Sequence, residues 1–325
     1  MNEKIGVVLL NLGGPDSLDA VEPFLFNLFN DPEIINFPLS FLFRKRLAKL
    51  ISSRRAPSIQ EQYKKIGGKS PIVELTKKQA ALLEENLREK GFDANVYIAM
   101  RYWKPFTEEA IERIEKDGVK KIVLLPLYPQ FSKATTGSSF KEWERLIAAK
   151  AKLKGIETAR VEHYHLFEPY LDALIERINQ CFERFPAGER DDVYILFSAH
   201  GTPMKLVREG DPYSGQICET VSAVKERGGW KNEHTLCFQS KVGPQKWLTP
   251  ATPDVVEELA AKGVKRMLVV PVAFVSDHLE TLFELGHEYA RLAKEKGVEQ
   301  YEVMEGLNDS ELFAESLAQL VLQKI

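Results

Sequence analysis

The stretch Val193-Tyr194-Ile195-Leu196-Phe197-Ser198-Ala199-His200-Gly201-Thr202-Pro203 decides how the rest of the chain is organised. Its apolar run is typical of a strand buried on both faces of a parallel sheet, and Gly201 and Pro203 end that strand. His200 is therefore expected at the carboxyl end of a central strand, where open α/β sheets bind their ligands. A lone histidine is more often a hydrogen-bonded core residue, so the residues around it decide its role.

The composition is that of a globular protein with room for two domains. The chain has 325 residues, of which 44% are apolar, and its net charge of −3 gives no sign of nucleic-acid binding. The cysteines Cys181, Cys218 and Cys237 form no C-x-x-C pattern and suit a reducing compartment. We expect no signal peptide and no membrane span, and a cytoplasmic location.

An internal repeat divides the chain into two similar halves. Thr107–Pro126 aligns without gaps on Thr252–Pro271, and each copy has the pattern of a helix followed by a strand. The repeat predicts an α/β protein with domains at 1–167 and 168–325, each with a small parallel sheet, and an apolar insertion at about 24–72. Besides the His200 strand, strands are expected at 5–10, 95–100, 121–125, 159–164, 235–239 and 267–270.

The segment Ile34–Ile51 within the insertion is unusually apolar and also basic. If a helix begins near Leu39, one face carries Leu42, Phe43, Leu47, Leu50 and Ile51, whereas Arg44, Lys45 and Lys49 lie mostly elsewhere. This pattern suits a core helix with a solvated basic side. It equally suits an amphipathic element that contacts an anionic membrane or lines an apolar ligand site.

A second group of polar residues follows the strand at 267–270. Glu280, Glu284 and Glu288 have the spacing i, i+4 and i+8, which places them on one face of an α-helix. Like charges at this spacing slightly destabilise a helix. The group is either an exposed acidic face or a ladder of carboxylates that guides a cation or passes protons, with its first member near His200.

These motifs together resemble the ferrochelatase family over residues 5–310. The motifs that carry the resemblance are Asn11-Leu12-Gly13-Gly14-Pro15, Arg101-Tyr102, Tyr128-Pro129-Gln130, Thr135-Thr136-Gly137-Ser138-Ser139, Phe197-Ser198-Ala199-His200-Gly201-Thr202-Pro203, Gln239-Ser240-Lys241-Val242-Gly243-Pro244 and Phe274-x-Ser276-Asp277-His278-x-Glu280-Thr281-Leu282-x-Glu284. The resemblance implies two similar Rossmann-like domains of the chelatase type, with the domain at 168–325 carrying the His/Glu metal site.

The resemblance also implies an activity, the insertion of ferrous iron into protoporphyrin IX in the last step of haem biosynthesis. His200 and Glu280 are the implied catalytic and metal-binding residues, with His200 acting as a base or as an iron ligand. Asp277, Glu284 and Glu288 would form a proton or metal path. Iron is here a substrate, and no permanently bound cofactor is expected.

A set of aromatic, aliphatic and polar residues is implied to line the porphyrin, although any single aromatic among them could equally be a core residue. The set is Leu12, Arg55, Tyr63, Ser70, Arg101, Tyr102, Tyr128, Trp247 and Phe274. Arg55 or Arg101 could bind a propionate. Because protoporphyrin partitions into membranes, we expect peripheral contact of Ile34–Ile51 with anionic membrane.

Two positions depart from patterns seen in parts of the family. Members with a [2Fe–2S] cluster use C-terminal cysteines and a mid-chain cysteine, whereas this chain has no cysteine after Cys237 and has Lys133 at the mid-chain position. No cluster is therefore expected. Members that act on coproporphyrin tend to have a tyrosine where this chain has Leu12, which favours protoporphyrin IX.

Three alternatives remain open from the sequence. The first is coproporphyrin III ferrochelatase activity. The second is a chelatase for another tetrapyrrole or metal, whose many-carboxylate substrate calls for a site richer in Arg and Lys. The third is a non-enzymatic haem or porphyrin carrier, which has no need of a carboxylate ladder.

Overall fold

A computed structural model describes residues 4–34, 40–150, 153, 155–243 and 245–325, apart from the side chains of Ser40 and Phe41. The chain divides into two compact units. Unit 1 consists of Met1–His163 and Ala314–Ile325, and unit 2 consists of Tyr164–Phe313. The segment 35–39, which belongs to the apolar stretch predicted from the sequence, lies outside the described residues.

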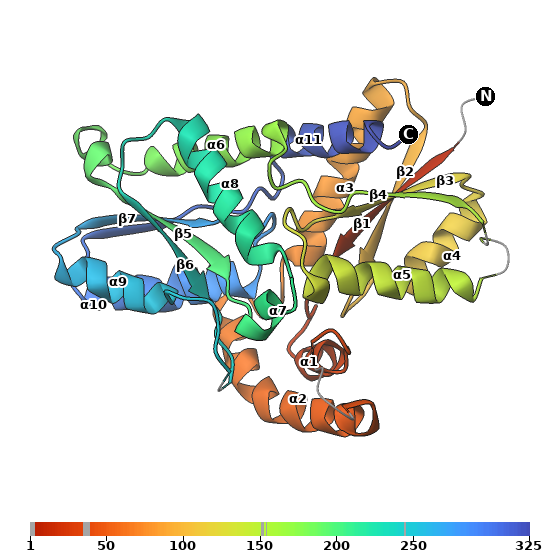
Figure 1. The fold of residues 1–325 in the computed structure, drawn as a ribbon, viewed down its shortest axis with the longest axis horizontal. Helices are drawn as coiled ribbons and strands as arrows, with labels where there is room; N and C mark the ends of the chain where they lie inside the picture. The colour runs from red at the N-terminus through yellow and green to blue at the C-terminus, as the bar shows by residue number, and fades with distance from the viewer. Residues whose placement is uncertain (1–3, 35–39, 151–152, 154, 244) are drawn as a thin grey trace. The chain divides into compact units, whose positions relative to one another are not determined.

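Each unit is built on one four-stranded parallel sheet, as predicted (Figure 1). The sheet of unit 1 has the order β2-β1-β3-β4, and that of unit 2 has the corresponding order β6-β5-β7-β8. The strands are β1 (Ile5–Asn11), β2 (Ala94–Met100), β3 (Lys121–Pro126), β4 (Glu157–Arg160), β5 (Tyr194–His200), β6 (His234–Gln239), β7 (Arg266–Pro271) and β8 (Gln300–Val303). The repeat in the sequence is therefore a repeat of sheet topology.

The central strands are those with continuous apolar sequences. All of β1 is buried, and so is β5 between Tyr194 and His200, because both lie between two neighbouring strands. The prediction for β4 was wrong by a few residues, since the strand begins at Glu157 rather than 159. The sequence did not predict β8, because Gln300-Tyr301-Glu302-Val303 is half polar, which suits an edge strand.

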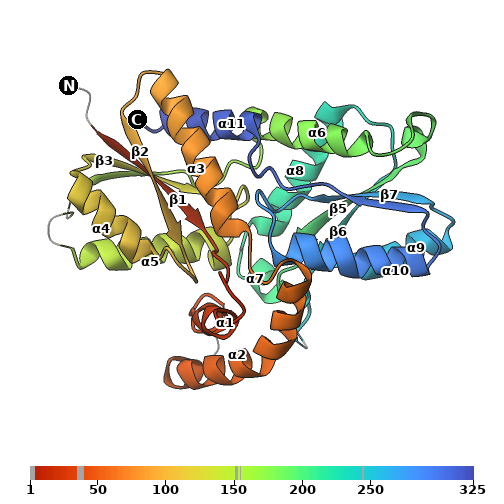
Figure 2. The same cartoon turned by 180° about the vertical axis from the view of Figure 1, so that it is seen from behind.

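Helices cover both faces of the sheets (Figure 2). In unit 1, apolar side chains of α4 and α5 pack on β1, β2 and β3, and in unit 2 those of α9, η4 and α10 pack on β5, β6 and β7. The helices are α1 (Val21–Phe29), α2 (Ser40–Lys65), α3 (Ile72–Glu89), α4 (Thr107–Asp117), η1 (Lys133–Gly137), α5 (Ser138–Ala148), α6 (Glu168–Phe182), η3 (Ala187–Asp192), α7 (Met204–Arg208), α8 (Tyr213–Gly228), α9 (Thr252–Ala261), η4 (Glu280–Tyr289), α10 (Ala290–Glu295) and α11 (Glu311–Leu322).

The repeated glycines end corresponding helices. Gly118 directly follows α4 with φ of +67°, and Gly263 follows α9 with φ of +87°. Residues with side chains rarely adopt this left-handed conformation, so glycine is favoured at both positions. The aligned sequences therefore share a helix, a left-handed turn and a buried strand.

The helix of the insertion presents its large apolar residues outward. In α2, Leu42, Phe43 and Leu50 are 59%, 53% and 46% exposed, whereas the buried residues include the small Ala48 and Ser52. The segment is therefore not the predicted core helix with a solvated basic side. The short side chains of α2 are the ones that pack closely in the interior, and its larger apolar side chains remain exposed to solvent. None of the described helices is long and apolar enough to cross a membrane.

The boundary between the units differs from the predicted one. It falls between His163 and Tyr164 rather than after 167, and the residues from Ala314 onward join unit 1 instead of the second domain. An ion pair of 3.0 Å between Lys90 and Glu315 contributes to this association of the C-terminal residues with unit 1. The sequence repeat could not reveal it, because α11 has no counterpart in the repeated segment.

Candidate active site

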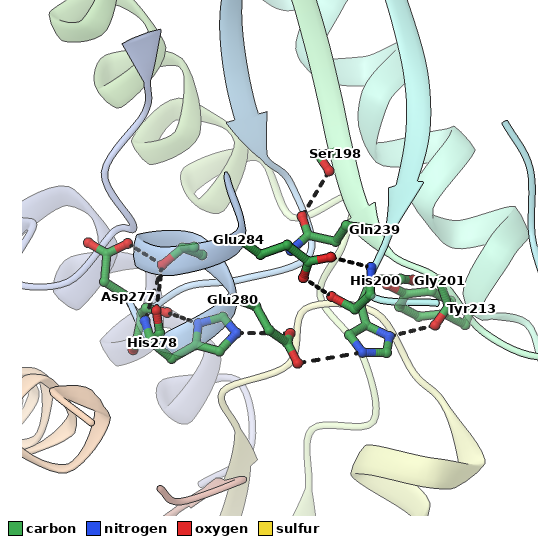
Figure 3. Close-up of polar contacts among 12 residues, drawn as sticks. Ser198, His200, Gly201, Tyr213, Gln239, Asp277, His278, Glu280 and Glu284 are labelled. Carbon is green, nitrogen blue, oxygen red and sulfur yellow. Dashed lines mark hydrogen bonds and ion pairs between the residues drawn. The ribbon is translucent and has the colours of Figure 1, made fainter. Parts of the chain in front are cut away.

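The candidate catalytic residues of unit 2 lie close together at the carboxyl ends of its parallel strands. β5 ends at His200, β6 ends at Gln239, and β7 leads through a short loop to His278 and Glu280 (Figure 3). Parallel strands place their carboxyl ends at one edge of a sheet, which is where α/β proteins bind ligands. The sequence prediction that His200 lies close to the first carboxylate of the ladder is confirmed.

Glu280 lies between two imidazoles. Its Oε1 atom is 3.7 Å from Nε2 of His200, and its Oε2 atom is 3.2 Å from Nε2 of His278. Nδ1 of His200 lies 2.5 Å from the carbonyl oxygen of Gly201. Because a carbonyl oxygen only accepts, Nδ1 carries the proton, and neutral His200 has its lone pair on Nε2. His200 is 36% exposed at its side chain, so this base is accessible.

His278 is oriented in the same way but has a different electrostatic environment. Its Nδ1 atom lies 3.0 Å from the carbonyl oxygen of Ser276, so its Nε2 atom faces Glu280. Burial opposes protonation, but the hydrogen bond and charge of Glu280, with smaller contributions from Ser276 and Asp277, raise the pKa of His278 above its usual value. His278 is therefore suited to donate a proton to Glu280.

The three glutamates of the ladder do not share one environment. Glu284 accepts hydrogen bonds from the backbone N–H of Ser240 at 2.9 Å, the hydroxyl of Ser240 at 2.5 Å and the hydroxyl of Tyr289 at 2.5 Å. Burial, followed by the charge of Glu280, raises its pKa. Glu288 is exposed. The segment forms a π-helix, whose wider turn removes the strict stacking at i, i+4 and i+8 expected for an α-helix.

Asp277 is buried and fully engaged with neighbouring backbone and side chains. It accepts from the hydroxyl of Thr281 at 2.8 Å, the side-chain amide of Asn308 at 2.6 Å and the backbone N–H of Gly306 at 3.2 Å. Asn308 accepts in return from the backbone N–H of Asp277 at 2.9 Å. These contacts fix the conformation of the turn on which His278 lies. Asp277 therefore positions His278 indirectly, by stabilising this turn.

Aromatic residues surround His200. The rings of Trp247 and Phe274 lie 6.3 and 6.4 Å from the His200 ring, and Phe274 lies 4.4 Å from the ring of His278. The hydroxyl of Tyr213 donates to the backbone oxygen of His200 at 3.0 Å. Both predicted porphyrin-lining residues of unit 2, Trp247 and Phe274, therefore lie beside the predicted catalytic histidine.

The porphyrin-lining residues predicted in unit 1 differ in accessibility. Tyr63, Ser70 and Tyr102 are buried, so their side chains are part of the interior. Leu12, Arg55, Arg101 and Tyr128 are half-buried. The guanidinium of Arg55 lies over the ring of Phe29, 5.5 Å from its centre. Burial, countered by Arg101 and Ser139, raises the pKa of Tyr128.

Three residues that contact predicted site residues were not themselves assigned a role from the sequence. His278 was visible in its motif but was not assigned a role, and its contact with Glu280 could have been suspected from the spacing of two residues. Asn308, at φ of +40°, and Asp31 are distant in sequence from their partners, and only tertiary structure brings them there. Within the described part of the chain, no three His, Cys, Asp or Glu side chains are placed to bind a metal ion together.

Solved structures with a similar fold are chelatases. SirB from Bacillus subtilis with Fe3+ matches with a TM-score of 0.59 at 13% identity, covering 98% of this chain and 95% of that one. The sirohydrochlorin chelatase SirB from Bacillus subtilis subspecies spizizenii, in complex with cobalt, matches with a TM-score of 0.56 at 11% identity, covering 98% and 94%. The protein thus has the two-sheet fold of the chelatases.

Sequence comparison identifies the family within this class. A family model described as ferrochelatase matches residues 4–325. The ferrochelatases of Trichodesmium erythraeum and Gloeobacter violaceus are 47% and 45% identical to the chain over 323 residues, covering 99% of this chain and 83% and 98% of those proteins. The chain belongs to the ferrochelatase family and is an enzyme that inserts a metal ion into a porphyrin.

Proposed function

We propose that the protein inserts ferrous iron into protoporphyrin IX and releases protohaem. The observation that carries this proposal is the His200–Glu280 pair at the carboxyl edge of the unit 2 sheet, in which Nε2 of His200 lies 3.7 Å from Oε1 of Glu280. A neutral imidazole and a carboxylate are the groups that metallation of a porphyrin requires, because it must remove two pyrrole protons and bind a divalent ion.

Each of the two groups has its own part in this reaction. Nε2 of His200 accepts a pyrrole proton as the N–H bond breaks, and Glu280 provides an anionic oxygen toward the incoming iron. The carboxylate of Glu284, whose pKa is raised by burial, is the next proton acceptor. One Fe2+ and one free-base porphyrin therefore yield one haem and two protons, with no oxidant or reductant consumed.

Protoporphyrin IX is proposed over coproporphyrin III because the residue at position 12 is leucine. Leu12 directly follows β1 and is half-buried, so it offers an apolar surface where a tyrosine would offer a hydroxyl. The test is the initial rate with ferrous iron and each porphyrin, followed by the shift of the Soret band. Faster turnover of protoporphyrin supports the proposal, and faster turnover of coproporphyrin contradicts it.

The same assay separates the other functions. Stoichiometric porphyrin binding without turnover indicates a carrier, and turnover of cobalt with a sirohydrochlorin-like ring but not of iron with protoporphyrin indicates another chelatase. A parallel iron determination on the purified protein tests the proposal that it contains no [2Fe–2S] cluster. That proposal is supported by Cys181 and Cys237, because burial raises the pKa of their thiols to about 12 and about 11 and thereby disfavours thiolates.

We further propose a cytoplasmic location with peripheral membrane contact. The membrane contact is supported by the exposed Leu42, Phe43 and Leu50 of α2, which share the helix with Arg46 and Lys49. Outward apolar residues beside basic ones favour the interface of an anionic bilayer. The contact would bring the enzyme to a substrate that is poorly soluble in water.

A further inference from the structure

Glu284 and Tyr289 are linked across one turn of the π-helix η4. The hydroxyl of Tyr289 donates to Oε1 of Glu284 at 2.5 Å. In an α-helix each residue advances by about 100°, so two residues five positions apart point to different sides. A π-helix closes its turn between residues i and i+5 and thereby brings the two onto one side. The contact therefore depends on the π-helical form of this segment.

The hydrogen bonds to Glu284 leave its carboxylate with one open acceptor position. A carboxylate offers about four lone-pair positions, two on each oxygen. Oε1 accepts from Tyr289 and from the backbone N–H of Ser240 at 2.9 Å, so both of its positions are used. Oε2 accepts from the hydroxyl of Ser240 at 2.5 Å. Among the residues that the structure describes, no second group donates to Oε2, so its other position is open.

Tyr289 is well suited to act as a permanent donor. The residue is 8% exposed and belongs to the apolar cluster beneath the unit 2 sheet, which fixes its ring. Burial, followed by the charge of Glu284 and with a smaller contribution from Glu288, raises the pKa of Tyr289, so its hydroxyl keeps its proton at neutral pH. Figure 3 shows the carboxylates of Glu280 and Glu284 extending toward the side of the site where His200 lies.

We propose that Tyr289 is a positioning residue for proton removal, because with Ser240 it orients Glu284 so that Oε2 receives the proton that leaves the reaction site. This inference rests on the proposed function, in which Glu284 is the next proton acceptor. The proton taken up by Nε2 of His200 ends on Oε2 of Glu284. The N–H bond breaks, its electron pair stays on the imidazole, and an O–H bond forms. A carboxylate that is already oriented does not have to reorganise when the proton arrives.

The test is Tyr289→Phe, measured alone and combined with Glu284→Gln. Phenylalanine retains the buried ring, and Oε1 keeps its hydrogen bond from the backbone of Ser240, so the variant should remain folded in urea unfolding. With ferrous iron and protoporphyrin IX, kcat should fall by about tenfold, as for one charge-assisted hydrogen bond, while KM for both substrates stays unchanged. The solvent deuterium isotope effect on kcat should increase, because proton transfer becomes the slow step.

The double variant separates positioning from a general loss of structure. If Tyr289 acts through the carboxylate, Tyr289→Phe should have no further effect on kcat once Glu284 has been replaced by glutamine. Ser240→Ala removes the donor to Oε2 and should also lower kcat at unchanged KM, so it tests the inference even if Tyr289→Phe is unstable.

Tyr194→Phe is the matched control. Tyr194 packs against the same apolar cluster, and its hydroxyl is hydrogen-bonded to that of Thr235 at 2.8 Å, but it begins β5 at the end of the strand opposite to His200. This variant should retain kcat and the isotope effect of wild type.

Two kinds of failure can be told apart. If Tyr289→Phe retains kcat, raises KM instead, or lowers kcat equally with and without Glu284→Gln, the inference is wrong although the chelatase proposal stands. If wild type metallates no porphyrin, the proposed function fails and this inference fails with it.

Discussion

Glu280 directs one carboxylate oxygen toward Nε2 of His200, at 3.7 Å, and its other oxygen is hydrogen-bonded to His278. The two imidazoles are fixed by carbonyl oxygens at their Nδ1 atoms, so both present Nε2 to the same carboxylate. Burial lowers the pKa of His278, but the hydrogen bond and charge of this carboxylate raise it above its usual value, whereas His200 is the more exposed of the two imidazoles. The site therefore places two imidazoles of different exposure against one carboxylate.

Replacing His200 tests the assignment of the base. Turnover of His200→Ala should fall by at least about a hundredfold, the usual contribution of a general base, while porphyrin binding persists. Steady-state metallation and a porphyrin titration measure the two quantities. His287→Ala, which removes an exposed imidazole from η4, is the control and should retain its rate. Near-normal turnover of His200→Ala would make His200 a structural residue.

Glu284→Gln should change the pH dependence of stability. Because burial and the charge of Glu280 raise the pKa of Glu284, the folded state binds its proton more tightly than the unfolded state does. This contribution to stability is present below the unfolded pKa of about 4.3 and is lost as pH rises through the raised folded pKa. The unfolding free energy of Glu284→Gln relative to wild type should therefore increase with pH across that window.

Urea unfolding of both proteins at a series of pH values from about 4 to 8 measures the difference. A difference that does not vary with pH would contradict the raised pKa. Turnover of the variant at neutral pH separately tests whether Glu284 belongs to a proton path. Glu288→Gln, at an exposed position of the same helix, is measured in parallel as the control variant.

Removing the side-chain amide of Asn308 should destabilise the turn on which His278 lies. In Asn308→Ala the buried Asp277 loses its donor at 2.6 Å, and its backbone N–H loses an acceptor. Leaving a buried group without its partner costs about 1–3 kcal/mol. Thermal or urea unfolding measures this loss, and Asn232→Ala, which removes a different buried amide from unit 2, is the comparison for stability. A larger fall in turnover for Asn308→Ala than for Asn232→Ala indicates positioning of the site.

Removing outward apolar residues from α2 should reduce membrane binding. Wild type should sediment with anionic vesicles at low salt, less so at high salt, and not with neutral vesicles, since each basic residue near the surface contributes about 1 kcal/mol. Leu42→Ser/Phe43→Ser should remain in the supernatant. Leu166→Ser alters a leucine of unit 2 that is 49% exposed and should bind as wild type does. If wild type remains in the supernatant with anionic vesicles at low salt, the proposed membrane contact is contradicted.

The repeated glycines predict matched stability changes in the two units. Gly118→Ala and Gly263→Ala should each destabilise the protein by about 1–2 kcal/mol, because a side chain opposes the left-handed conformation. An added Cβ meets no atom within 4 Å at either position, so the cost is one of backbone conformation. Gly215→Ala, in α8 and also without a nearby atom, should instead stabilise by about 0.5–1 kcal/mol. Equal behaviour of all three variants would contradict this explanation.

Local patterns in the sequence determined most of the architecture. The apolar run before His200 predicted a strand buried on both faces, and the match of Thr107–Pro126 with Thr252–Pro271 implied two similar sheets. Strand and helix periodicity depend on neighbours in sequence, so these features were readable. The carboxyl-edge position of His200 followed from the same reasoning and is confirmed.

Tertiary structure decided which polar groups act together. Asp31 meets Arg101 and Ser138, and Asn308 meets Asp277, through contacts between residues far apart in the chain, and no local pattern predicts such pairs. The π-helical form of Glu280–Tyr289 also separates Glu284, held by Ser240, from the exposed Glu288. Sequence alone therefore determined the strand on which the base lies, while folding determined the protonated nitrogen, the buried carboxylates and the side of α2 that faces outward.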